Sequence, residues 1–179
     1  MTKLSPKALI LVALLAFASA ASAQQATAPA GNPLDVIPDK MPFSTPYGAP
    51  ISLSRAQAAI SAAMAEAEKK GWALNVAVVD SGANLVAFGR MDGAQLASVA
   101  IAEHKARASA NYRRPTRVFE DGVQKSDYKY LLSLDGIIAS RGGIPLIEDG
   151  KLIGAIGCSG GTGSQDEAAC TVGAATIDK

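Results

Sequence analysis

Residues 142–167 read GGIPLIEDGKLIGAIGCSGGTGSQDE, and this stretch decides the fold. Two apolar runs flank Asp149-Gly150, a dipeptide that suits a two-residue type I′ turn because both central positions need positive φ. The second run ends in a glycine-rich loop. Ser164, with Glu167 three residues later, then predicts a capping box at the start of a helix. The expected order is therefore hairpin, glycine-rich loop and helix.

The junction between this loop and the helix is suited to bind an anion. The first turn of a helix has unpaired N–H groups and the positive end of the helix dipole, and glycines let the backbone approach a bound group. Alternatively, the glycines only form a tight corner. No Gly-Lys-Ser/Thr follows, so the loop is not a nucleotide P-loop. The candidate anion-binding residues are Ser159, Gly160, Gly161 and Thr162.

The N-terminus has the pattern of a secretory signal peptide over residues 1–23. Lys3 and Lys7 precede an apolar run at 8–18, and Ala21-Ser22-Ala23 fits an Ala-x-Ala cleavage site. The apolar run is too short to span a bilayer comfortably. We therefore expect a periplasmic or extracellular protein that has no membrane span after cleavage.

Residues 24–51 form a proline-rich extended segment that contains six of the nine prolines. Proline blocks helices and removes backbone donors, which favours a flexible leader. Alternatively, Met41, Phe43 and Tyr47 are apolar enough to dock on a neighbouring surface. The folded domain is expected at 52–179.

Hydrophobic spacing in this domain predicts an α+β fold. The strands are short and joined as hairpins, so we expect an antiparallel sheet of about five strands packed with helices. Ser54, with Gln57 three residues on, is the expected cap of the first helix. The expected elements are helices at 54–70, 94–111 and 164–177, strands at 72–79, 85–88 and 137–139, the hairpin described above, and an irregular segment at 118–130.

Charge and cysteine content narrow the possible partners. The formal net charge is +1, so no basic surface points to nucleic acid as a partner. Cys158 and Cys170 are the two cysteines. An exported protein permits a disulfide between them, but two buried thiols are an equal alternative, because the sequence does not give the distance between them.

Three groups of short motifs follow one another along the domain. They are VAVVDSG (76–82) with LVAFGRMDG (85–93), IAEHKAR (101–107) with RPT (114–116), and GGIP (142–145), GAIG (154–157), SGG (159–161) and QDE (165–167). In this order they resemble the GlcG/HbpS-like family over roughly residues 53–177. The resemblance implies a profilin-like sandwich and frequent homo-oligomers. Some members of the family are extracellular haem-binding proteins, and others accompany corrinoid or glycolate enzymes.

His104 is the candidate metal ligand, because it is the only histidine and imidazole is a common axial ligand of haem iron. It lies on a helix face rich in alanine, which would let a flat macrocycle approach. The alternative is a histidine at a subunit contact or on the helix surface. Without His104, iron would need Met91, Tyr112 or a cysteine.

Basic residues near His104 are candidates to bind haem propionates. Lys105 and Arg107 match the family motif, and Arg114 belongs to a cluster of arginines around Pro115. Guanidinium groups bind carboxylates in a bidentate manner. The alternative is surface ion pairing, for example Glu103 with Arg107 at i,i+4.

We therefore hypothesise an exported, homo-oligomeric protein that binds haem or a related tetrapyrrole. A second hypothesis is an enzyme or accessory subunit that binds a small organic acid at the glycine-rich loop. A third is a structural oligomer without a ligand. The single histidine and the absence of a nucleophile elbow argue against a hydrolase, and no catalytic residue is assigned. Haem degradation is implied by the resemblance alone.

Overall fold

The computed structural model describes residues 37–41 and 43–177. The signal peptide predicted at 1–23 and the first part of the proline-rich segment lie outside these residues. The chain divides into two units, Met1–Asp39 and Lys40–Lys179, and the second contains the helices and strands described below. Within the described ranges, no helix is both long and apolar enough to cross a membrane.

The second unit is an α+β domain built on one antiparallel sheet, as predicted. The sheet has four strands in the described residues, where the sequence predicted about five, and the strand order is β2-β1-β4-β3. The two hairpins therefore lie side by side and meet at β1 and β4. The elements are α1 (Leu53–Lys69), β1 (Asn75–Asp80), β2 (Leu85–Arg90), α2 (Ala97–Tyr112), α3 (Arg117–Lys125), the 3₁₀ helix η2 (Lys129–Ser133), β3 (Gly143–Glu148), β4 (Lys151–Ser159) and α4 (Gly163–Ala174).

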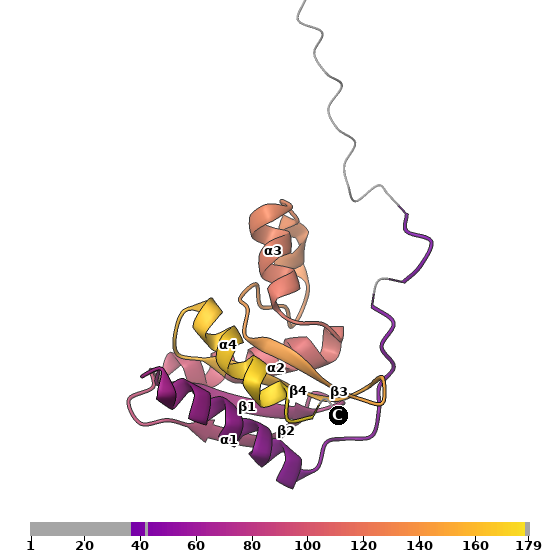
Figure 1. Cartoon of the computed structure of the whole chain (residues 1–179). Helices are drawn as coiled ribbons and strands as arrows, with labels where there is room; N and C mark the ends of the chain where they lie inside the picture. Colours follow the sequence, from indigo (N-terminus) through magenta and orange to yellow (C-terminus); the bar gives the residue numbers. More distant parts are fainter. Residues whose placement is uncertain (1–36, 42, 178–179) are drawn as a thin grey trace, which may run out of the picture. The chain divides into compact units, whose positions relative to one another are not determined.

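Helices cover both faces of the sheet. In Figure 1, α1 and α4 lie in front of the sheet and α2 lies behind it. Side chains of β1 alternate between these layers: Val76 and Val78 join the core under α1 and α4, whereas Ala77 and Val79 join the core under α2. Because β1 is buried on both faces, its sequence is a continuous apolar run.

Small residues let α2 lie close to β4. Gly157 faces α2, and a Cβ atom at this position would collide with the carbonyl oxygen of Ala102. Ala102, Ala106 and Ala155 are fully buried in the same layer. The alanine content of the chain thus allows a close contact between helix and sheet.

The hairpin between β3 and β4 forms as predicted. Asp149 and Gly150 have φ values of +48° and +72°, and the flanking residues Glu148 and Lys151 pair across the turn. The local chemistry of the dipeptide therefore predicts the turn, whereas the register shift between Leu146 and Ile147 farther along β3 is not part of that signal.

Two predicted helix caps were wrong by two residues. The N-cap of α4 is Thr162 rather than Ser164, and its partner in the capping box is Gln165 rather than Glu167. In the same way, Ser52 caps α1 in place of Ser54. The earlier start of α4 has a physical reason, because it brings the carboxylate of Asp166 to the backbone N–H of Gly161, 3.0 Å away.

The segment 118–130 is not irregular, as the sequence suggested, but mostly helical. It contains α3 and the start of η2, and residues 137–139 form no strand. Thr116, the N-cap of α3, makes no side-chain capping bond, so the usual signal of a helix start is missing. The helix packs instead through buried Phe119 and Gly122.

Residues 43–50 dock on the domain, which was the alternative to a flexible leader. The hydroxyl of Tyr47 donates to the carbonyl oxygen of Asn111 at 2.8 Å. The backbone N–H of Gly48 donates to the carbonyl oxygen of Leu152 at 2.7 Å. These bonds attach the segment to the end of α2 and to β4.

The two cysteines form a disulfide, which settles the alternatives left open by the sequence. Cys158 lies near the end of β4 and Cys170 lies in α4, with their Cα atoms 5.7 Å apart. The bond joins the hairpin to the helix that follows it.

Candidate functional site

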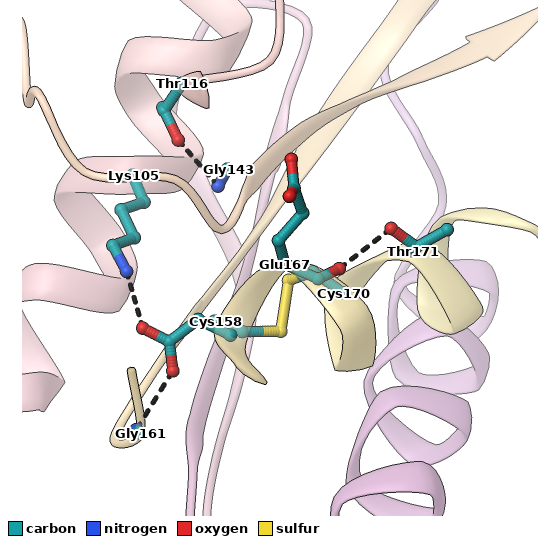
Figure 2. The surroundings of a disulfide bond; sticks show 9 residues. Lys105, Thr116, Gly143, Cys158, Gly161, Glu167, Cys170 and Thr171 are labelled. Atoms are coloured by element: carbon teal, nitrogen blue, oxygen red, sulfur yellow. Dashed lines mark hydrogen bonds and ion pairs between the residues drawn. A yellow bond between two sulfur atoms is a disulfide. The ribbon is translucent and has the colours of Figure 1, made fainter. Parts of the chain in front are cut away.

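Lys105 is buried and paired within the protein. Its ammonium Nζ lies 2.7 Å from Oδ2 of Asp166, and the two side chains are 1% and 3% exposed. Figure 2 shows Lys105 reaching from α2 toward the loop at Gly161, beside the disulfide. Gly142 makes room for this pair, since a Cβ atom there would lie 2.8 Å from Cβ of Asp166. Lys105 is therefore not placed to meet a ligand at the surface.

The glycine-rich loop is largely occupied by the protein's own side chains. The second oxygen of Asp166 accepts from the backbone N–H of Gly161 at 3.0 Å. Gln165 Oε1 accepts from the backbone N–H of Thr162 at 2.8 Å. A carboxylate ligand would have to displace these groups, so the geometry does not favour the organic-acid alternative at this loop.

Ser159 and Gly160 also serve packing within the domain. Ser159 is buried, and its hydroxyl donates to Oγ of Ser98 at 3.0 Å. A Cβ atom at Gly160 would collide with the carbonyl oxygen of Ala73. Of the four loop residues predicted as an anion site, Gly161 and Thr162 are exposed.

His104 lies on the exposed outer face of α2. Ala97 and Ala100, which precede it on this face, are also exposed. The sequence pattern extended this alanine-rich face to Ala108, which was wrong, because Ala108 is fully buried in a core cluster with Phe119. Within residues 37–41 and 43–177, no hydrogen bond or ion pair joins the imidazole to another residue. No group of three acidic, histidine or cysteine side chains in these ranges could hold a metal ion.

Arg107 is exposed one turn beyond His104 and takes part in a surface ion pair. Its Nη2 lies 2.9 Å from Oε2 of Glu103, the i,i+4 pairing that the sequence offered as an alternative. Exposed pairs of this kind are weak, about 0.3–0.5 kcal/mol. Arg107 can therefore leave Glu103 to contact a carboxylate above the α2 face.

Arg114 lies elsewhere, in a pocket beyond the end of α2. Its guanidinium carbon is 3.4 Å from the ring centre of Phe43 and 5.8 Å from that of Phe119. Its Nε donates to the carbonyl oxygen of Tyr112 at 2.8 Å. Burial, followed by the nearby charge of Arg113, lowers the pKa of Arg114 below its usual value.

The sequence interpretation missed this pocket, which has a volume of about 540 Å³. Its walls come from three parts of the chain: the docked arm (residues 43–50, before α1), the end of α2, and the α3–η2 segment. The signal that could have revealed it was the aromatic content, because four of the nine aromatic residues (four Phe, four Tyr and one Trp in total) line this one cavity. The aromatic residues are Phe43, Phe119, Tyr128 and Tyr130.

The structure thus separates the predicted site residues into three places. Lys105 and the loop residue Gly161 meet at the buried carboxylate of Asp166. His104 and Arg107 share the outer face of α2. Arg114 lies past the C-cap of α2, whose last residue, Tyr112, is roughly 12 Å beyond His104 along the helix axis at a rise of about 1.5 Å per residue.

The comparisons with known proteins all indicate the same family. Residues 51–175 match the family model described as "Haem degrading protein HbpS-like". Protein GlcG of Escherichia coli is 36% identical over 109 residues, which cover 61% of this chain and 81% of GlcG.

Solved structures extend the similarity to the fold. A double mutant of HbpS from Streptomyces reticuli is 29% identical with a TM-score of 0.68, covering 78% of this chain and 99% of that one. A PduOC–haem complex is 29% identical with a TM-score of 0.66, covering 72% of this chain and 95% of that one. The family match spans most of the chain and the folds agree, so this chain belongs to the HbpS-like family.

Proposed function

We propose that the mature protein is an exported haem-binding protein that works as a homo-oligomer. The observation that carries the proposal is the similarity in fold to PduOC, a relative whose structure was solved as a haem complex. Family membership by itself does not assign a ligand, because one fold can host many functions. The residues of this chain must therefore fit the group.

The outer face of α2 fits a flat, iron-containing macrocycle. His104 offers an exposed imidazole that no other described residue engages, and Ala97 and Ala100 project little beyond the helix backbone. Arg107 is available for a propionate at the cost of a weak surface pair with Glu103. Bound haem would supply an iron centre, and His104 would hold it through one imidazole nitrogen.

A second copy of the chain would complete such a site. The α2 face is open, and haem lying on it would leave much of its apolar surface in water. Covering that surface with another protomer would recover the hydrophobic free energy, about 25 cal/mol per Å² of apolar area buried. We therefore propose that oligomers form across α2.

Export is supported by two independent features. The lysines, apolar run and Ala-x-Ala site of residues 1–23 fit a cleaved signal peptide. The disulfide between Cys158 and Cys170 fits an oxidising compartment, because disulfides rarely persist in the cytosol. A fusion of residues 1–23 to a reporter enzyme that is active only outside the cytoplasm tests this part directly.

Titration of residues 24–179 with hemin tests the proposed ligand. We expect a shifted Soret band with saturation, and loss of that band position in His104→Ala. Gln57→Ala is the matched control, because Gln57 is exposed on α1, on the opposite face of the sheet. Wild-type protein that leaves the hemin spectrum unchanged would contradict haem binding. Equal spectra for wild type and His104→Ala would contradict only the role of His104 as the iron ligand, and would leave haem binding itself standing.

Light scattering tests the oligomer. The expected result for residues 24–179 is a mass above that of one such chain, reduced when a bulky charged group is placed on the face by Ala100→Glu. A monomeric mass for wild type at micromolar concentration, with and without hemin, would exclude the proposed assembly.

A further inference from the structure

The pocket beyond the end of α2 is a separate candidate for a ligand site. It has a volume of about 540 Å³, within the range of roughly 300–1,000 Å³ that is typical of small-molecule sites. It does not include His104 or the glycine-rich loop. Its lining residues are Phe43, Arg114, Val118, Phe119, Asp121, Gly122, Lys125, Ser126, Tyr128, Tyr130 and Leu131.

Aromatic side chains form much of the wall of the pocket. Phe119 is 1% exposed and forms an edge-to-face pair with Tyr112, with ring centres 5.3 Å apart. Tyr128 and Tyr130 have ring centres 6.0 Å apart. The backbone N–H of Tyr128 donates to the carbonyl oxygen of Gly122 at 2.9 Å, which fixes η2 against α3. Phe119 lies buried beneath this wall, whereas Tyr128 is partly exposed and Tyr130 is exposed, so these two tyrosine rings are the ones that a flat ligand could contact.

Arg114 is a cation without a counter-ion in the described part of the chain. Phe43 covers one face of its guanidinium group, and a single bond from Nε to the carbonyl oxygen of Tyr112 uses one of its donors. No carboxylate oxygen in those residues lies within 4.0 Å of its nitrogens. Its remaining N–H groups have the fork geometry that binds a carboxylate with two hydrogen bonds.

The other charges at the pocket neutralise one another. Lys125 Nζ lies 2.8 Å from Oδ1 of Asp121, and Arg117 and Arg141 approach the same carboxylate at 3.5 Å. Asp121 is therefore surrounded by cations and does not oppose an anionic ligand. Arg114 remains the cation that a ligand could pair with.

We propose that this pocket binds a small planar aromatic carboxylate, with its ring against Tyr128 and Tyr130 and its carboxylate on Arg114. The site is distinct from the α2 face proposed for haem. An acid of this kind matches both features of the pocket, since a neutral ring leaves the guanidinium unpaired and a small aliphatic acid leaves the ring faces uncovered. A partly buried cation such as Arg114 is less well solvated than an exposed one, so it gains more free energy from pairing with a carboxylate.

Calorimetric titration of residues 24–179 with 2-naphthoate tests the proposal. We expect saturable binding of one equivalent per chain, weakened about 10- to 100-fold in Arg114→Gln, which corresponds to the loss of a charge-assisted hydrogen-bonded pair. Arg114→Lys keeps the charge but loses the fork, and should fall between the two. 2-Naphthamide and acetate, which lack the charge and the ring respectively, should bind at least tenfold more weakly than 2-naphthoate.

Arg113→Gln is the matched control. Arg113 neighbours Arg114 but lies over Tyr47 instead, and donates to the carbonyl oxygen of Thr45 at 3.0 Å. It does not line the pocket, so its loss should leave 2-naphthoate binding unchanged. Equal weakening by Arg113→Gln and Arg114→Gln would indicate a general charge effect and overturn the proposal.

Tyr130→Leu keeps the proposal testable if Arg114→Gln disturbs the docked arm. Tyr130 is 47% exposed, so its replacement should leave the folded state intact while removing one ring from the pocket wall. Several-fold weaker 2-naphthoate binding is expected. Unchanged binding in both Tyr130→Leu and Arg114→Gln would exclude this pocket. Competition between hemin and 2-naphthoate would overturn the separation of the two sites.

Discussion

Lys105 and Asp166 hold together two helices that pack on opposite faces of the sheet. Lys105 extends from α2 and Asp166 lies in the first turns of α4, so their contact closes the end of the sheet near Gly142. The same carboxylate accepts the backbone N–H of Gly161. One buried acid therefore fixes the loop, the start of α4 and the middle of α2.

Breaking this pair should destabilise the protein strongly. Lys105→Met leaves the carboxylate of Asp166 buried without its cation, for which we expect a loss of about 3–5 kcal/mol in the free energy of unfolding. Urea denaturation monitored by circular dichroism measures it. The double variant Lys105→Met/Asp166→Asn should cost less than the sum of the single changes, because no isolated charge remains.

The surface pair of Arg107 and Glu103 gives the matched control. Arg107→Met removes the same type of interaction from the same helix at an exposed position, and should cost less than about 1 kcal/mol. If Lys105→Met were no more destabilising than Arg107→Met, the buried pair would not have the structural role described here.

At the scale of elements, local signals predicted the structure where local chemistry determines it. Asp149-Gly150 specified the hairpin. Helix α3 was missed because its cap makes no side-chain bond, and Gly122 interrupts its sequence. Its stability comes from contacts with η2. These contacts join residues that are separated in the chain, so a local sequence pattern does not contain them. The pocket was missed for the same reason, since Phe43 and Tyr130 are far apart in the chain.

The disulfide is the element-scale feature that a measurement can test most directly. Cys158 and Cys170 are separated by 12 residues and link β4 to α4. By the loop-entropy model, closing a loop of this length stabilises the folded state by about 3 kcal/mol. We expect Cys158→Ala/Cys170→Ala to lower the midpoint of urea denaturation accordingly. Reductant should lower it in wild type and leave the double variant unaffected; no response in wild type would argue against the bond.

At the scale of the whole domain, charged side chains connect α3 to the rest of the fold. Arg141, just before β3, holds Glu120 of α3 through bonds of 2.7 Å from its backbone N–H and its Nε. Its Nη1 also lies 3.7 Å from Oε2 of Glu167 in α4. Because α3 forms one wall of the pocket, this network keeps the pocket attached to the sheet.

Acid should weaken this attachment. Burial disfavours the charged form of Glu120, but the bonds from Arg141 outweigh it and lower the pKa of Glu120 below its ordinary value of 4.5. An acid with a lowered pKa stabilises the folded state fully above its unfolded pKa, and loses that contribution as pH falls through the folded value. We therefore expect the free energy of unfolding to decline below about pH 4.5, with a shallower decline in Glu120→Gln, measured by urea denaturation at a series of pH values. Asp92→Asn, a change at an exposed turn, should keep the wild-type slope. A Glu120→Gln profile parallel to wild type would show that the acid response arises elsewhere, and that α3 does not depend on this ion pair.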